Sequence, residues 1–247
     1  MEHIDGNVIN RDLTARMKYI QSFLGWDAAN DGKLIEACKP VLAPILTNVV
    51  DAVYDQLLKY DITAASFAPR QSQEGGATVD ASVGDLHAGH ENIKYRKDFL
   101  KGYLVRLVSN HDWSPESKFW EYIDMVGKVH TGSTDSGLKH RKNRPALFVE
   151  YREINLLLGW VENAVTDIVM GVEGLELQTK VDILKALNKF WWIQNDLFAR
   201  HYIPGLRESR TQDAERPLTW IDKLKADPVF PIVSALVLLA VIFGWKF

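Results

Sequence analysis

The histidine at position 130 is the residue whose type and placement most directly suggest chemistry. It ends a predicted helix whose apolar side carries residues at positions i, i+4, i+7 and i+11, namely Phe119, Ile123, Val126 and His130. An imidazole on an apolar surface needs a partner for its lone pair or its proton. A neutral imidazole is a suitable axial ligand for haem iron. A core histidine bonded to the backbone is the commoner arrangement, and the spacing alone does not decide between the two.

A tyrosine further upstream is the second candidate. Tyr54 lies beside a row of aliphatic residues at helical spacing, Ile45, Val49, Val53 and Leu57. This placement is consistent with either a ligand-facing hydroxyl or an ordinary core tyrosine. His87, His90 and Glu91 are metal-ligand types, but no further His or Cys partner is evident in the sequence. Glycine-rich phosphate loops, nucleophile elbows and catalytic cysteine settings are absent, so the residues do not indicate an enzyme class.

Helical periodicity runs through almost the whole chain and predicts an all-α fold. The pattern predicts helices over residues 13–24, 33–59, 87–109, 146–170 and 178–202. Pro40 and Pro44 are expected to divide the second of these, because proline disfavours a helix interior. The helix that ends at His130 is predicted to open at Ser114 as N-cap, followed by Pro115. No strand alternation and no internal repeat is visible in the sequence.

Composition limits the classes of partner. The chain has 247 residues, a net charge of −3 and a pI near 6.2. Proteins that bind nucleic acid usually carry a clear basic excess, so we expect no nucleic-acid partner. Cys38 is the only cysteine, which excludes an intrachain disulfide and favours a reducing compartment.

The C-terminal end differs in composition from the rest of the chain. Residues 228–245 (PVFPIVSALVLLAVIFGW) are an uncharged run of 18 residues. As a helix they would extend about 27 Å, close to the ~30 Å hydrocarbon thickness of a bilayer. The run is apolar on every side, which favours a transmembrane helix over a buried core helix. Residues 204–227 are predicted to be a polar linker with a short juxtamembrane segment.

Three segments and one phenylalanine resemble the protoglobin and globin-coupled-sensor branch of the globins. Residues 123–130 (IDMVGKVH) resemble the family's segment that ends in the proximal histidine. Residues 148–154 (FVEYREI) resemble the start of its G helix, and residues 48–54 (NVVDAVY) resemble its B helix. Phe67 follows thirteen residues later, where globins carry the phenylalanine of the CD corner. The resemblance implies a globin-like helical sandwich with an extra N-terminal helix over residues 1–203.

The same resemblance implies a site for haem b. His130 would be the proximal ligand of the iron, and Tyr54 would donate a hydrogen bond to bound dioxygen from the distal side. Phe67 would pack against the ring. Tyr103 falls near the distal position of the E helix, which leaves open whether one or two hydroxyl groups reach the gas. The expected haem-binding set is completed by Val53, Val126 and Tyr151. Some protoglobins have a tryptophan that narrows the pocket where this chain has Val53. It is therefore in doubt whether access to the pocket is restricted in this chain as it is in those proteins.

We therefore expect a haem globin that binds dioxygen or another diatomic gas as a sensor or carrier. Its tail is expected to bind the lipid bilayer as a single-pass anchor of the endoplasmic reticulum or mitochondrial outer membrane, with the N-terminal head in the cytosol. The resemblance also implies a homodimer through the last two globin helices. Two alternatives stay open: a haem-free, tail-anchored interaction module, and a haem-dependent redox enzyme such as a nitric oxide dioxygenase.

Overall fold

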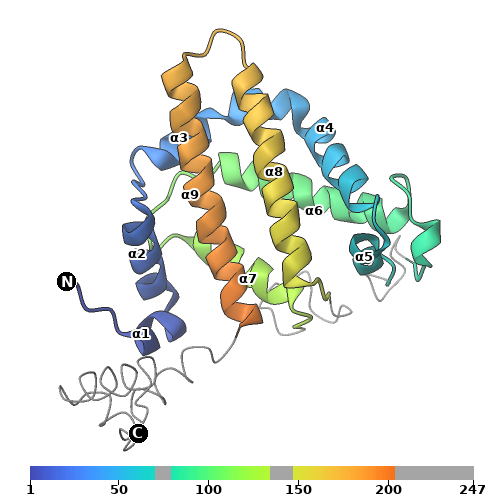
Figure 1. The fold of residues 1–247 in the computed structure, drawn as a ribbon, viewed down its shortest axis with the longest axis horizontal. Coiled ribbons are helices and arrows are strands. Elements are labelled where there is room, and N and C mark those ends of the chain that lie inside the picture. The colour runs from blue at the N-terminus through green and yellow to red at the C-terminus, as the bar shows by residue number, and fades with distance from the viewer. Residues whose placement is uncertain (70–78, 134–146, 204–247) are drawn as a thin grey trace, which may run out of the picture. The chain divides into compact units, whose positions relative to one another are not determined.

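Two long helices, α8 (Tyr151–Gly171) and α9 (Leu177–Tyr202), form an antiparallel hairpin (Figure 1). The computed structural model describes residues 1–69, 79–133 and 147–203, which belong to one compact unit. The elements that precede the hairpin are the helices α1 (Gly6–Arg11), α2 (Leu13–Leu24), α3 (Asp31–Ala37), α4 (Lys39–Leu57), α5 (Asp61–Ala64), α6 (Glu91–Val108) and α7 (Lys118–His130), with the short 3₁₀ turns η1 (Ala65–Phe67) and η2 (Val83–Asp85).

The predicted all-α class is confirmed. Within the described residues, β structure is limited to one isolated antiparallel bridge between Thr131 and Phe148. The first predicted helix, residues 13–24, has the bounds of α2. The Asp12 carboxylate caps its N-terminus by accepting a hydrogen bond from the Ala15 amide at 2.6 Å. Gly25 ends it with a φ of 62°, a left-handed conformation that favours glycine.

The two prolines do not divide the second predicted region as expected. That region breaks at Cys38, between α3 and α4, and Pro40 lies in the first turn of α4. Proline is tolerated there because the amides of a first turn have no helical acceptor. Pro44 lies inside α4, and the helix continues through it to Leu57.

The N-cap predicted for the helix before His130 was wrong by three residues. Ser117, not Ser114, caps α7, and its hydroxyl accepts a hydrogen bond from the Phe119 amide at 3.2 Å. The Ser114 hydroxyl instead donates to the Asp112 carboxylate at 2.7 Å. Since the Ser114 side chain is engaged within its own turn, the helix begins one turn later, at Lys118.

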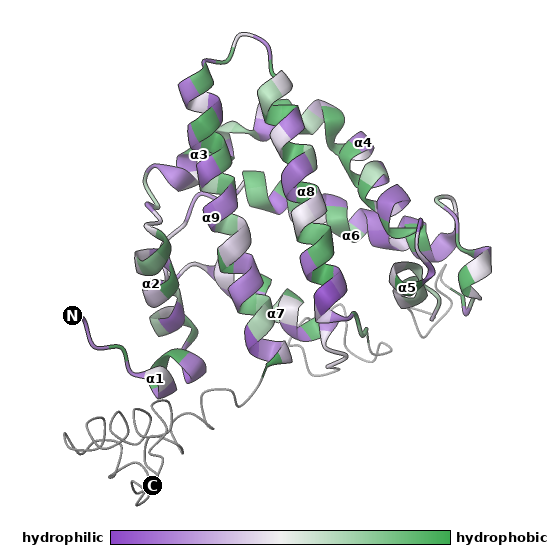
Figure 2. Ribbon diagram, viewed as in Figure 1, coloured by the Kyte–Doolittle hydropathy of each residue, from purple (hydrophilic) through white to green (hydrophobic). Residues whose placement is uncertain are grey.

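The core has a large and a small cluster of buried side chains. The large cluster joins α2, α3, α7 and α9 around aromatic residues that include Trp113, Trp120 and Phe190. The small one joins α4 and α6 through Val50, Tyr54 and Ile93. Figure 2 shows hydrophobic and hydrophilic residues alternating along α8 and α9, so these helices are amphipathic and cover the core.

No single helix of the described residues is long and apolar enough to cross a bilayer. Two consecutive helical segments, Lys39–Leu57 and Asp61–Phe67, are together long and apolar enough, but the chain bends by 114° between them. The predicted linker (residues 204–227) and membrane anchor (residues 228–245) lie outside the described residues.

Candidate functional site

A cavity of about 540 Å³ opens among α3, α4, α6, α7, α8 and α9. Its volume lies within the range of about 300–1,000 Å³ typical of small-molecule and cofactor sites. Most of the side chains that line it are aliphatic or aromatic. The structure brings six of the seven predicted site residues to this one cavity: Val53, Tyr54, Phe67, Tyr103, Val126 and His130.

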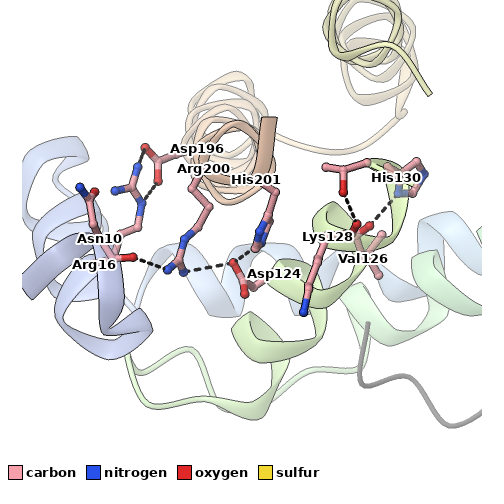
Figure 3. Close-up of polar contacts among 10 residues, drawn as sticks. Asn10, Arg16, Asp124, Val126, Lys128, His130, Asp196, Arg200 and His201 are labelled. Carbon is pink, nitrogen blue, oxygen red and sulfur yellow. Dashed lines mark hydrogen bonds and ion pairs between the residues drawn. The ribbon is translucent and has the colours of Figure 1, made fainter. Parts of the chain in front are cut away.

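The His130 imidazole has a defined orientation at the cavity wall. Its Nδ1 lies 2.7 Å from the Val126 carbonyl oxygen, one turn earlier on α7 (Figure 3). A carbonyl oxygen can only accept, so Nδ1 must carry the hydrogen. In the neutral ring the lone pair is then on Nε2. A backbone bond to the other nitrogen is the usual way in which a histidine is oriented for a metal.

The backbone at the end of α7 is tied to the segment that enters α8. The His130 carbonyl accepts a hydrogen bond from the Val149 amide at 2.9 Å, and the Gly132 amide donates to the Leu147 carbonyl at 2.8 Å. Gly132 has a φ of 83°, a backbone angle that residues other than glycine rarely adopt. These contacts fix the position of the His130 backbone.

Tyr54 and Phe67 lie together on the side of the cavity formed by α4 and η1. Their ring centroids are 5.6 Å apart. The fully buried Asn92 stabilises this side of the cavity. Its side-chain amide donates hydrogen bonds to the Phe67 carbonyl at 2.9 Å and to the Val79 carbonyl at 2.8 Å. The sequence analysis did not identify Asn92, because its partners lie 25 and 13 residues away in the chain.

Burial keeps the Tyr54 hydroxyl protonated. Loss of water around this side chain raises the pKa of Tyr54 well above its ordinary value, and the positive charge of Arg96 lowers it only in part. The hydroxyl therefore remains a hydrogen-bond donor throughout the physiological pH range.

The Tyr103 hydroxyl is directed to a protein partner. It donates to the Gln194 side-chain carbonyl, and both residues line the cavity. A hydroxyl has a single hydrogen to donate. The contact with Gln194 thus uses the hydrogen that Tyr103 could have offered to a gas as a second donor.

Tyr151 is the one predicted site residue that lies outside the cavity lining. Its ring stacks on Tyr202, with centroids 5.2 Å apart, and its hydroxyl donates to the Asn195 side chain at 3.1 Å. Tyr151 therefore joins the start of α8 to the end of α9.

A sequence comparison identifies the family, and a structure comparison identifies a similar fold. A family model described as Protoglobin matches residues 13–208, which is most of the chain. The chain belongs to the protoglobin family. The protoglobin fold is also similar to the globin domain of a Geobacter sulfurreducens globin-coupled sensor, with a TM-score of 0.51 and 14% identity over 75% of this chain and 97% of that one. No curated protein shows a significant sequence match.

Globin-family domains bind haem, and the residues of this protoglobin fit that group. An imidazole with its lone pair on Nε2, an apolar wall and a neutral tyrosine donor are the side-chain types that a haem pocket needs. Arg96, which sequence reasoning did not single out, adds a positive charge to the cavity lining. Among the described residues, no group of three His, Cys, Asp or Glu side chains could hold a metal ion by itself. His87 and His90 thus do not form such a group.

Proposed function

We propose that this protoglobin binds haem b through His130 and reversibly binds dioxygen, or another diatomic gas, as a membrane-anchored sensor or carrier. The observation that carries the proposal is the 2.7 Å contact between His130 Nδ1 and the Val126 carbonyl, in a cavity that Tyr54 also lines. This contact selects the tautomer that an iron ligand requires. A core histidine with no ligand role needs neither a cavity beside it nor a buried donor in the same cavity.

The bound haem supplies an iron centre that takes up the gas. The chain supplies the rest. His130 would hold the iron, and Phe67, Val53 and Val126 would pack against the macrocycle. The Tyr54 hydroxyl would donate a hydrogen bond to the gas, which would favour a partly anionic ligand such as bound dioxygen. The apolar lining excludes water, which strengthens that hydrogen bond.

The absorption spectrum of the full chain tests the haem-binding part. Protein purified from haem-replete cells is expected to be red, with a Soret band that shifts when carbon monoxide is added to the reduced form. The shift reports a gas-accessible iron, which a haem with two protein ligands lacks. A colourless protein with native helix content by far-ultraviolet circular dichroism would overturn the proposal in favour of a haem-free interaction module.

The membrane-anchoring part depends on residues 228–245, whose uncharged run matches the thickness of a bilayer. A fluorescent protein fused ahead of residues 205–247 is expected to label an internal membrane, either the endoplasmic reticulum or the mitochondrial outer membrane. The matched control carries two lysines in the middle of the run, each costing about 2.5–3.5 kcal/mol of insertion free energy. A wild-type fusion that stays diffuse in the cytosol would remove the anchor.

A further inference from the structure

The helix that carries His130 approaches α9 at very short range. Gly127, one turn before His130, lies against Phe198 of α9. A Cβ atom at position 127 would lie 2.9 Å from Phe198 Cδ1 and 3.0 Å from Phe198 Cα. The first distance is shorter than real Cβ contacts, and the second is tighter than most of them and involves backbone, which cannot turn aside. Glycine at this position therefore allows α7 to pack directly on α9.

Phe198 also contacts the imidazole itself. The ring centroids of Phe198 and His130 are 5.5 Å apart, and their planes differ by 34°. The Val126 carbonyl holds one ring nitrogen. The buried Phe198 ring occupies the space beside the imidazole, so it limits the other orientations that the side chain could adopt by rotation about its Cα–Cβ and Cβ–Cγ bonds. Both contacts therefore contribute to where Nε2 points.

One turn further back, polar side chains join the same two helices. The Asp124 carboxylate of α7 accepts hydrogen bonds from Arg200 at 3.2 Å and from His201 at 2.9 Å (Figure 3). We call these three residues the Asp124 cluster. Their side chains are only 15–20% exposed, so solvent screens the charges little. Arg200 also donates to the Asn10 carbonyl at 2.9 Å, which ties α1 to the cluster.

We infer that the last turns of α9 position the iron ligand of this protoglobin: Phe198 sets the plane of the His130 imidazole, and the Asp124 cluster fixes α7 along α9. This inference rests on the proposed haem function. Asp124, Gly127 and His130 are spaced by three residues on α7, so all three lie on the side that meets α9. Phe198 and Asp124 are positioning residues, because they act through His130.

The test weakens each contact by a conservative substitution in the full haem-loaded chain. Phe198→Leu keeps an apolar side chain but removes the ring face, and Asp124→Asn keeps the shape but removes the charge. Asp196→Asn is the matched control. Asp196 also lies on α9 and pairs with an arginine, Arg16, through two contacts of 2.6 Å, but it joins α9 to α2 rather than to α7. Thermal unfolding of each variant measures the general loss of stability.

Two measurements report the position of the ligand. The first is the iron–imidazole stretching band of the reduced protein by resonance Raman spectroscopy, which is expected to shift in both variants and not in Asp196→Asn. The second is haem transfer to excess apomyoglobin. Loss of outer partners of a metal ligand typically weakens metal binding by about 10- to 100-fold. We expect transfer about tenfold faster in Phe198→Leu and Asp124→Asn, and at the wild-type rate in the control.

Unchanged Raman bands and transfer rates in both variants, with haem still bound through His130, would overturn the positioning role and leave the haem function intact. An equal change in Asp196→Asn would also overturn it, because the effect would then be a general loosening of α9. A wild-type chain that holds no haem would overturn the proposed function, and the positioning role with it.

Discussion

Replacing His130 with glycine is expected to abolish the Soret band of the full chain or to weaken it drastically. The backbone hydrogen bonds from Val149 to His130 and from Gly132 to Leu147 do not involve the imidazole and keep the backbone in place, so the variant loses the iron ligand and little of the fold. Free imidazole fits the space that the side chain vacates. Adding it at millimolar concentration is therefore expected to restore a histidine-type spectrum to the variant, which a merely misfolded protein would not regain.

A surface histidine provides the control for this experiment. The His111 side chain is 78% exposed and pairs with Glu36, and it is not among the residues that line the cavity. His111→Gln should keep the wild-type spectrum and haem content. If His130→Gly also kept them, with no change on addition of imidazole, another side chain would be the iron ligand and the assignment of His130 would be wrong.

Local signals were sufficient to predict most of the helices. Periodic apolar residues located α2, α8 and α9 to within a few residues, since an amphipathic helix leaves its period in the sequence. Two of the errors have an identifiable physical cause. Ser114 resembles an N-cap in sequence, but its hydroxyl is engaged by Asp112, and Pro44 is accommodated within a helix that tertiary packing stabilises.

The candidate site was predictable where segments of this chain could be matched residue by residue to segments of the family. His130, Tyr54 and Phe67 come from three separate segments, and the structure places all three at one cavity. Contacts between distant segments were not predictable from spacing. The Tyr103–Gln194 hydrogen bond joins residues 91 apart, and neither the stacking of Tyr151 on Tyr202 nor the contact of Phe198 with His130 leaves a periodic signal. Such pairs are determined by how helices cross, which a single sequence does not reveal.

We expect the Tyr54 hydroxyl to be the donor toward a gas in this cavity. Its ring is almost fully buried, and its raised pKa keeps the hydroxyl neutral and able to donate. Tyr103 lines the same cavity, but its hydrogen is directed to Gln194. Because the two tyrosines differ in this respect, removing each hydroxyl in turn separates a contact with the gas from a contact within the protein.

Tyr54→Phe is therefore expected to accelerate dioxygen release from the reduced, haem-loaded chain by about 10- to 150-fold. A hydrogen bond to a charged group contributes about 1.5–3 kcal/mol, and each 1.4 kcal/mol is about tenfold. The less polar ligand carbon monoxide should be affected much less. Stopped-flow measurement of both release rates tests this, with Tyr103→Phe as the matched control that should leave them near wild type. Since burial raises the pKa of Tyr54 above about 10, its ordinary value, the wild-type rate should not change between pH 6 and about pH 9. A large effect of Tyr103→Phe with none of Tyr54→Phe would reverse the assignment of the donor.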